Sequence, residues 1–288
     1  MVCNVKKKQA GIGSRIVKLV VSRVQDNHRI LCYDFGEETQ SLSLVPISDL
    51  HVGGEEFDEK ALVEFLQTAE RENYYLILNG DLFDCAICGS RGNVYEATMS
   101  PQEALDYCVN LFYPYRDRIL CINTGNHSQR INRAVGIDVD KSFSTLLGLK
   151  DVYSDTATFL HLQLGKDRHG RRFNYVFYIT HGWGNGRTIG GRISAGSQLL
   201  MYANANCYIL SHTHIKNVNS TVFNEYDIRT KRLYKKNQFI VHSGCFTKSA
   251  RYSIRSGLRS SSSGAPVISV SGKRRMIKVF MEAFEEEI

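Results

Sequence analysis

The chain has 288 residues, 43% of them hydrophobic and 23% charged, and a formal net charge of +7. This composition is that of a globular protein with one large domain or two small ones. It excludes a membrane-spanning protein, because no stretch approaches the roughly 20 consecutive apolar residues that a spanning helix needs. The mild positive charge leaves two interpretations open: basic groups that attract nucleic acid or polyphosphate, or solvated cations on strand edges.

The N-terminus and the cysteines indicate a cytoplasmic protein. Lysines occupy positions 6–8, but no apolar stretch of the signal-peptide type follows them. The eight cysteines are scattered along the chain rather than paired. Cys85 and Cys88 form a Cys-x-x-Cys spacing, but no second pair and no histidine lies at ligand spacing nearby. We therefore expect two free thiols in a loop rather than a zinc or redox site.

The first predicted elements are two strands at residues 16–24 and 30–35, with turn residues at 25–28 between them. We interpret residues 1–40 as an N-terminal β-hairpin extension packed on the core, and residues 41–288 as the main domain. From residue 41, strand patterns alternate with amphipathic helical patterns, which is typical of an α/β fold. Strands are predicted at 41–47, 74–78 and 119–124, and helices at 58–71, 100–113, 128–135 and 141–147.

The second half of the chain is richer in strand. Strands are predicted at residues 156–164, 173–180, 207–210, 221–226, 238–241, 267–270 and 276–284. Between the second and third of these strands, a glycine-rich loop covers residues 182–194, and a helix is predicted over residues 195–205.

Polar residues follow five of the predicted strands directly after each strand ends. Asp81 and Asp84 come after the buried strand at 74–78, where ligands gather in an open α/β sheet. Four further stretches repeat this arrangement: Asp49-Leu50-His51, Gly125-Asn126-His127, Thr180-His181-Gly182 and Ser211-His212-Thr213-His214. Any one of them could be a simple turn, but together they supply carboxylate, amide and imidazole ligands, which suit zinc, manganese or iron. Two neighbouring metals need a bridging carboxylate, and Asp81 is the natural bridge.

The order Asp-x-His, Gly-Asp-x-x-Asp, Gly-Asn-His, His-Gly and x-His-x-His over residues 49–214 resembles the calcineurin-like metallophosphoesterase superfamily. The resemblance implies a four-layer α/β/β/α sandwich with two central mixed sheets. It also implies two divalent metal ions, with manganese favoured over iron or zinc. One ion would take Asp49, His51, Asp81 and His214, and the other would take Asp81, Asn126, His181 and His212.

The same resemblance implies a mechanism. A water or hydroxide bridging the two metals would attack phosphorus in line. His127 would protonate the leaving oxygen, with Asp84 orienting its ring. Two departures stand out: the family usually has Asp or Glu where this chain has Ser128, and Gly where it has Ser211. Neither removes a ligand, although Ser128 could weaken an orienting contact.

The resemblance also bears on the branch of the family. Asp84 is followed by Cys85-Ala86 rather than by the Arg-Gly of the protein phosphatases, which argues against the phosphoprotein branch. Gly-Asp-Leu-Phe-Asp looks more like the repair-nuclease and phosphodiesterase branches, although little room remains after residue 214 for their DNA-capping domain. The glycine-rich loop after His181 and the region of Tyr95 resemble phage- and prophage-encoded members.

We therefore predict a two-metal phosphodiesterase or nuclease whose partner is a phosphoester substrate such as nucleic acid or a nucleotide, with no membrane partner. Arg130, Arg187 and Arg192 are candidates for binding phosphate, since arginine binds it bidentately. Trp183 could stack on a base or pack its loop onto the sheet, and we favour the second. Two alternatives remain: a phosphomonoesterase on a small molecule or phosphoprotein, and a non-catalytic interaction module, which would be expected to have lost metal ligands.

Overall fold

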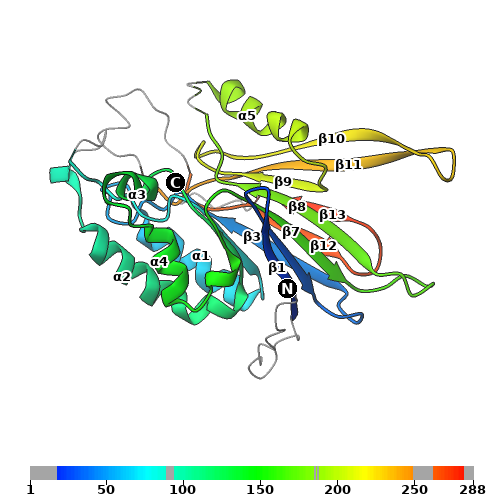
Figure 1. Ribbon diagram of the computed structural model, residues 1–288, viewed down its shortest axis with the longest axis horizontal. Helices are drawn as coiled ribbons and strands as arrows, with labels where there is room; N and C mark the ends of the chain where they lie inside the picture. Colours follow the sequence, from blue (N-terminus) through cyan, green and yellow to red (C-terminus); the bar gives the residue numbers. More distant parts are fainter. Residues whose placement is uncertain (1–17, 89–93, 185, 187, 249–261, 282–288) are drawn as a thin grey trace, which may run out of the picture.

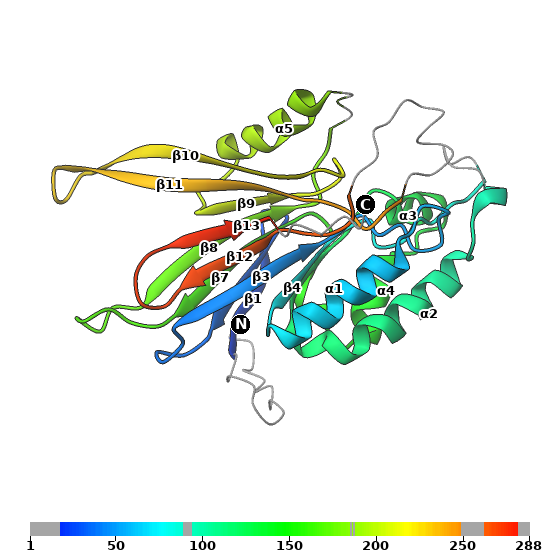
Figure 2. The ribbon, with the colours of Figure 1, turned by 180° about the vertical axis from the view of Figure 1, so that it is seen from behind.

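The computed structural model describes residues 18–88, 94–184, 186, 188–248 and 262–281. Two β-sheets pack face to face, and helices cover their outer faces (Figure 1; Figure 2 shows the opposite side). Helices α1 to α4 lie on one sheet and α5 lies on the other, which gives four α/β/β/α layers. The fold is therefore the predicted α/β sandwich with two mixed sheets.

The six-stranded sheet has the order β13-β12-β3-β4-β5-β6. Its strands are β3 (Ser41–Ile47), β4 (Tyr75–Asn79), β5 (Ile119–Asn123), β6 (Tyr153–Ser154), β12 (Val267–Ser271) and β13 (Ile277–Phe280). The strands from β3 to β6 are parallel, whereas β12 and β13 pair antiparallel. Every residue of β4 and β5 is buried, as expected of central parallel strands that are covered on both faces.

The seven-stranded sheet has the order β1-β2-β7-β8-β9-β11-β10. Its strands are β1 (Lys18–Gln25), β2 (His28–Asp34), β7 (Ala157–Leu164), β8 (Phe173–Thr180), β9 (Cys207–Leu210), β10 (Lys216–Asp227) and β11 (Arg232–Ser243). The N-terminal hairpin extends this sheet, because β2 pairs parallel with β7. Whether residues 1–40 form a separate unit stays an interpretation.

The helices of the first half lie close to their predicted positions. They are α1 (Glu59–Arg71), α2 (Pro101–Phe112), α3 (Ser128–Val135) and α4 (Val139–Leu146), joined by the 3-10 helices η1 (Val94–Glu96), η2 (Tyr113–Arg118) and η3 (Lys150–Val152). At the start of α2, the Ser100 and Glu103 side chains each bond the other residue's backbone N–H, so the capping box forms. None of the helices in the described residues has the length and apolar character needed to cross a membrane.

Among the elements predicted in the second half, one helix and two strands were wrong in extent. The helix predicted at 195–205 is α5 (Ile189–Gln198), followed by the 3-10 helix η4 (Leu199–Met201). It begins earlier because Thr188 caps it by accepting the Gly191 N–H. The strands predicted at 221–226 and 238–241 lie within β10 and β11, which form a much longer hairpin. Many of the residues paired along this hairpin are polar, because neither face of its outer part is buried. The alternation of hydrophobic and polar residues therefore does not reveal its full length.

Candidate metal centre

All seven candidate metal ligands lie at one end of the sandwich. They occupy the loops that follow β3, β4, β5, β8 and β9, and are Asp49, His51, Asp81, Asn126, His181, His212 and His214. β3, β4 and β5 are parallel neighbours in one sheet, and β8 and β9 are parallel neighbours in the other. Their carboxyl ends therefore meet at the same edge of the fold, which is where α/β sheets bind ligands.

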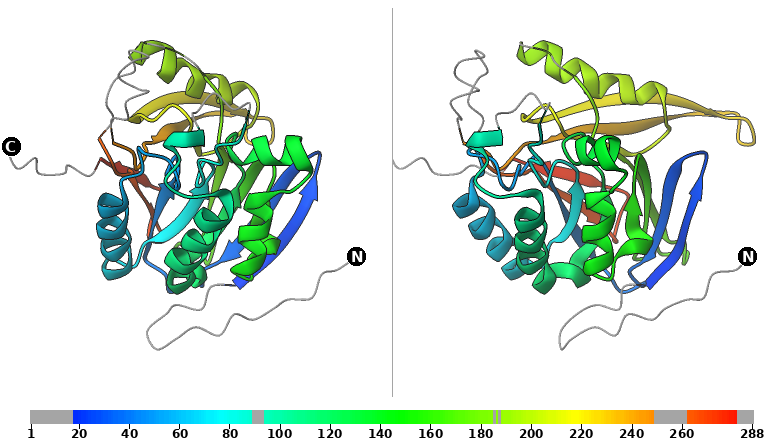
Figure 3. Two further views of the ribbon diagram at one scale, coloured as in Figure 1. Left: turned by 90° about the vertical axis from the view of Figure 1, so that its left-hand side faces the viewer. Right: turned by 60° about the vertical axis from the view of Figure 1, so that its left-hand side comes forward.

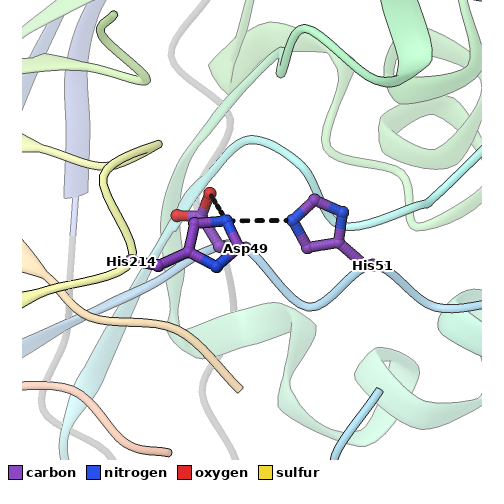
Figure 4. A group of neighbouring side chains, drawn as sticks. All are labelled: Asp49, His51 and His214. Carbon is purple, nitrogen blue, oxygen red and sulfur yellow. Dashed lines mark hydrogen bonds and ion pairs between the residues drawn. The ribbon is translucent and has the colours of Figure 1, made fainter. Parts of the chain in front are cut away.

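A first cluster contains Asp49, His51 and His214 (Figure 4). The Nε2 atom of His214 lies 3.3 Å from Asp49 Oδ1 and 3.3 Å from His51 Nε2. The three side chains point toward one another, Asp49 and His51 from the loop after β3 and His214 from the distant loop after β9. Three of the four ligands that the resemblance implies for one metal are thus within reach of a single ion.

A second cluster contains Asp81, His181 and His212. The Nε2 atom of His181 lies 3.1 Å from Asp81 Oδ2 and 3.0 Å from the Asn126 side-chain oxygen. Asp81 also forms a group with His51, so its carboxylate lies between the two clusters. This is the position that a bridging ligand must occupy.

The donor set fits a divalent metal. Asp49 is fully buried; its Oδ2 accepts bonds from Ser48 Oγ and His212 N, and its Oδ1 faces His214 Nε2 at 3.3 Å. A buried carboxylate is costly unless it is paired, and a coordinated cation would pair it in place of a protonated His214. His181 Nδ1 lies 2.8 Å from the Asn79 carbonyl, a contact that leaves Nε2 facing the centre, as in other ligating histidines.

The backbone at the site is in an unusual conformation. Five of the candidate ligands have positive φ angles: Asp49 (52°), His51 (52°), Asp81 (49°), His212 (67°) and His214 (54°). Residues other than glycine rarely adopt this left-handed region, and such strain concentrates at functional sites. This backbone conformation thus directs the side chains of the five residues toward the two ligand clusters.

At two glycines of the motifs, neighbouring atoms come so close that no side chain would fit. A Cβ atom at Gly80 would lie 2.6 Å from His181 Nδ1, and one at Gly125 would lie 2.0 Å from the Asp81 backbone nitrogen. Neither neighbour can move away, because one is a candidate ligand and the other belongs to the strand-end turn that carries Asp81. The glycines therefore allow the loops after β4 and β5 to touch.

His127 and Asp84 lie beside the two clusters. His127 Nδ1 is 3.0 Å from Asp84 Oδ1, and the His127 backbone N–H donates to Asp81 Oδ1 at 2.8 Å. Arg130 is the third member of this group, with Nη2 2.9 Å from His127 Nε2. Burial alone would raise the pKa of Asp84, but the hydrogen bond from His127 and the nearby positive charges lower it overall. Asp84 is therefore a carboxylate that holds the His127 ring by Nδ1.

Of the other two arginines predicted to bind phosphate, neither is seen to reach the ligand clusters in the described residues. Arg192 Nε donates to the Gly186 carbonyl at 2.9 Å, so its guanidinium is engaged by its own loop. Arg187 lies outside the described residues.

Trp183 packs edge-on against Tyr202 with 5.8 Å between ring centroids, and is 39% exposed. Cys85 is buried and Cys88 is exposed, and neither forms a disulfide within the described residues.

A buried polar chain behind the ligands escaped the sequence analysis. Ser48 Oγ contacts both Asp49 and Ser243 Oγ, and Ser243 Oγ donates to Ser211 Oγ at 2.9 Å. Asn79 Nδ2 donates to the same Ser211 oxygen at 2.6 Å. Ser211, one of the two departures from the family pattern, therefore joins the two sheets behind the metal centre. No local pattern predicts this chain, because its members lie far apart in the sequence.

The second departure, Ser128, also has a structural partner. Its Oγ donates to the buried carboxylate of Asp140, which also accepts a bond from Thr124 Oγ1 at 2.6 Å and one from Gly125 N at 3.3 Å. Burial raises the pKa of Asp140 to about 6, although these hydrogen bonds oppose the shift. A carboxylate from α4 thus reaches the Gly-Asn-His loop, where the family usually has an acidic residue in the loop itself.

Glu56 is a further residue that sequence reasoning missed. Its Oε1 lies 3.9 Å from His51 Nδ1, and it forms a group with His51 and Asp84. Burial raises its pKa. The signal was available in the sequence, because Gly53 and Gly54 follow His51 and allow the chain to turn back on the site.

Metal binding should release protons and strengthen as the pH rises. Burial by itself lowers the pKa of His181, but the charge of Asp81 outweighs it and raises the value to about 9. The pKa of His214 is likewise raised by Asp49 against the effect of burial. The His181 ring is therefore protonated in the metal-free protein at pH 7, and a metal ion must displace its proton; the raised pKa of His214 acts in the same direction.

We expect calorimetric titrations of Mn²⁺ at pH 7, in two buffers of different ionisation enthalpy, to show release of about two protons. The affinity should rise up to about pH 9, the pKa of His181. The protonated rings stabilise the metal-free fold. This contribution to the free energy of unfolding should be lost as the pH rises through about 9, the pKa of His181. An affinity that is constant between pH 7 and 9 would contradict this expectation.

Comparisons with known proteins agree with this geometry. A family model described as calcineurin-like phosphoesterase matches residues 43–244, more than half of the chain. A search of curated proteins finds no match. Among solved structures, the chain is similar to a conserved uncharacterized protein, a predicted phosphoesterase, from Streptococcus pneumoniae. The two are 10% identical over 83% of this chain and 88% of the other, with a TM-score of 0.34, too low to carry an argument.

Proposed function

Since the chain belongs to the calcineurin-like phosphoesterase family and is a metal-dependent phosphoester hydrolase, we propose that it hydrolyses phosphodiesters of nucleic acids or nucleotides. The observation that carries this proposal is the group formed by His127, Asp84 and Arg130 beside the two ligand clusters. An alkoxide leaving group of a diester needs a proton in the transition state, and this group is built to deliver one.

We assign the ligands as the resemblance implies. Asp49, His51, Asp81 and His214 would hold one ion, and Asp81, Asn126, His181 and His212 would hold the other. Mn²⁺ is the ion that we favour for this mixture of oxygen and nitrogen donors. When bound, two such ions polarise phosphate oxygens and lower the pKa of water.

The remaining chemistry belongs to the side chains. The Asp84 carboxylate accepts the Nδ1–H of His127 and holds the ring so that Nε2 can give a proton to the leaving oxygen. Arg130 now contacts that Nε2, and it would exchange this contact for a phosphate oxygen of the substrate. As part of the same proposal, the protein is cytoplasmic and nearer the nuclease and phosphodiesterase branches than the protein phosphatases.

The test compares two nitrophenyl esters with Mn²⁺ added. We expect bis(p-nitrophenyl) phosphate to be turned over faster than p-nitrophenyl phosphate, and EDTA to abolish both activities because the ligand clusters are then empty. Preference for the monoester would replace this proposal with a phosphomonoesterase. Failure to bind Mn²⁺, shown by elemental analysis, would favour a non-catalytic interaction module instead.

A further inference from the structure

The outer half of the β10–β11 hairpin is a two-stranded ribbon, here called the ribbon (residues 221–238). β9 pairs with β11 only over residues 239–242, so the ribbon strands have no other strand neighbour within the described part of the chain. Figures 1 and 3 show the ribbon running past the ends of β9 and α5. Two isolated strands are only marginally stable in water, which makes an exposed element of this kind a candidate for binding.

The ribbon carries an unusual number of exposed apolar side chains. Their exposed fractions run from 45% at Tyr234 to 75% at Ile228, which lies in the turn at the tip. The set comprises Val222, Phe223, Tyr226, Ile228, Leu233 and Tyr234. Clustered exposure of this type marks interaction sites, whereas single exposed residues are ordinary. Charged residues alone are enough to keep an exposed strand edge from aggregating, so that purpose does not explain the exposed apolar side chains.

The charge of the ribbon is positive. It contains five basic residues and two acidic ones. Four of the basic residues are exposed and form no ion pair within the part of the chain that the structure describes: Arg229, Lys231, Arg232 and Lys235. The acidic Asp227 is engaged in the turn, where its Oδ1 accepts the backbone N–H groups of Arg229 and Thr230. A second copy of the ribbon would be repelled, so the partner should be a polyanion.

We propose that the ribbon binds double-stranded DNA by lying in its major groove. The major groove of B-DNA admits a two-stranded β-ribbon, whereas the deep, narrow groove of duplex RNA does not. The four cations would contact phosphates on either side, and the exposed apolar side chains, Ile228 at the tip among them, would contact base edges and thymine methyl groups. The inference rests on the proposed function, because DNA is a phosphodiester and β10 begins two residues after His214.

The test measures DNA binding apart from hydrolysis. Metal-free full-length protein in EDTA is titrated into a fluorescein-labelled duplex of about 30 base pairs, and anisotropy is followed at several salt concentrations. The ribbon variant has Arg229→Gln, Lys231→Gln, Arg232→Gln and Lys235→Gln. A control variant with the same change in charge has four exposed residues on the α1–α4 side replaced: Lys60→Gln, Arg71→Gln, Lys141→Gln and Lys150→Gln.

We expect the ribbon variant to lose at least about tenfold in affinity and to reduce the slope of log K against log salt by about 3 to 4, which corresponds to four lost phosphate contacts. The control should change affinity less than about threefold, and Ile228→Ser should weaken binding without changing the slope. A duplex RNA of the same sequence should bind more weakly than the DNA.

Equal losses in the ribbon and control variants, or no DNA binding by the wild type at low salt, would overturn the inference. A shift from dimer to monomer in the ribbon variant, seen by sedimentation, would also overturn it by making the ribbon an interface between copies. Turnover of the bis-nitrophenyl diester should be the same in all variants. Ribbon-dependent DNA binding by a wild type that lacks diester turnover would instead reject the proposed function and leave the ribbon inference standing.

Discussion

Replacing Asp81 by asparagine should reduce diester turnover by about a thousandfold or more. The carboxylate is 1% exposed and lies between the two ligand clusters, with Oδ2 3.1 Å from His181 Nε2. Asparagine keeps the shape but removes the charge that two neighbouring cations need between them, and losing several kcal/mol of transition-state stabilisation lowers the rate tenfold per 1.36 kcal/mol. The measurement is turnover of bis(p-nitrophenyl) phosphate with saturating Mn²⁺.

Elemental analysis of the same variant should show fewer Mn²⁺ ions per chain than the wild type. The matched control is Asp155→Asn, an exposed carboxylate outside the site, which should leave both activity and metal content unchanged. A variant that retains two ions and wild-type turnover would remove Asp81 from the role of bridging ligand. Circular dichroism would establish that any loss arises in a folded protein.

Replacing His127 by alanine should slow the hydrolysis of esters with poor leaving groups by about 10² to 10⁴, the range typical of general-acid catalysis. The ring is held through Nδ1 by Asp84 at 3.0 Å, so Nε2, which now contacts Arg130, is the atom that would face a leaving oxygen. Nitrophenolate leaves without a proton, so the loss on the nitrophenyl diester should be small. Metal content should stay at the wild-type level, because His127 is not among the assigned ligands.

The decisive comparison is the ratio of kcat for a methyl p-nitrophenyl diester to kcat for an unactivated dinucleotide, in the wild type and in His127→Ala. His169→Ala, in an exposed turn, serves as the control and should not change that ratio. A variant as active as the wild type on the dinucleotide would show that the proton comes from elsewhere. A loss of Mn²⁺ would mean that His127 is a ligand rather than an acid.

The juxtaposition of the seven candidate ligands could be expected from sequence, because each motif directly follows a predicted strand. Parallel strands bring their carboxyl ends to one edge of a sheet. Asp49 and His214 follow strands of different sheets, so their meeting was expected through the family resemblance, and they lie 3.3 Å apart. The roles assigned to them remain predictions. The pairing of His127 with Asp84 was expected only through the family resemblance.

What the sequence alone determined were features that adjacent residues encode: the buried strands, the helices of the first half, and the order of polar residues after each strand. Tertiary structure decided where Ser128 and Ser211 find partners, in Asp140 and Asn79 respectively. It also decided the length of the β10–β11 hairpin. The physical reason is that local periodicity reports only which side of an element is buried, whereas cross-sheet hydrogen bonds and pairing between exposed strands depend on what packing brings together.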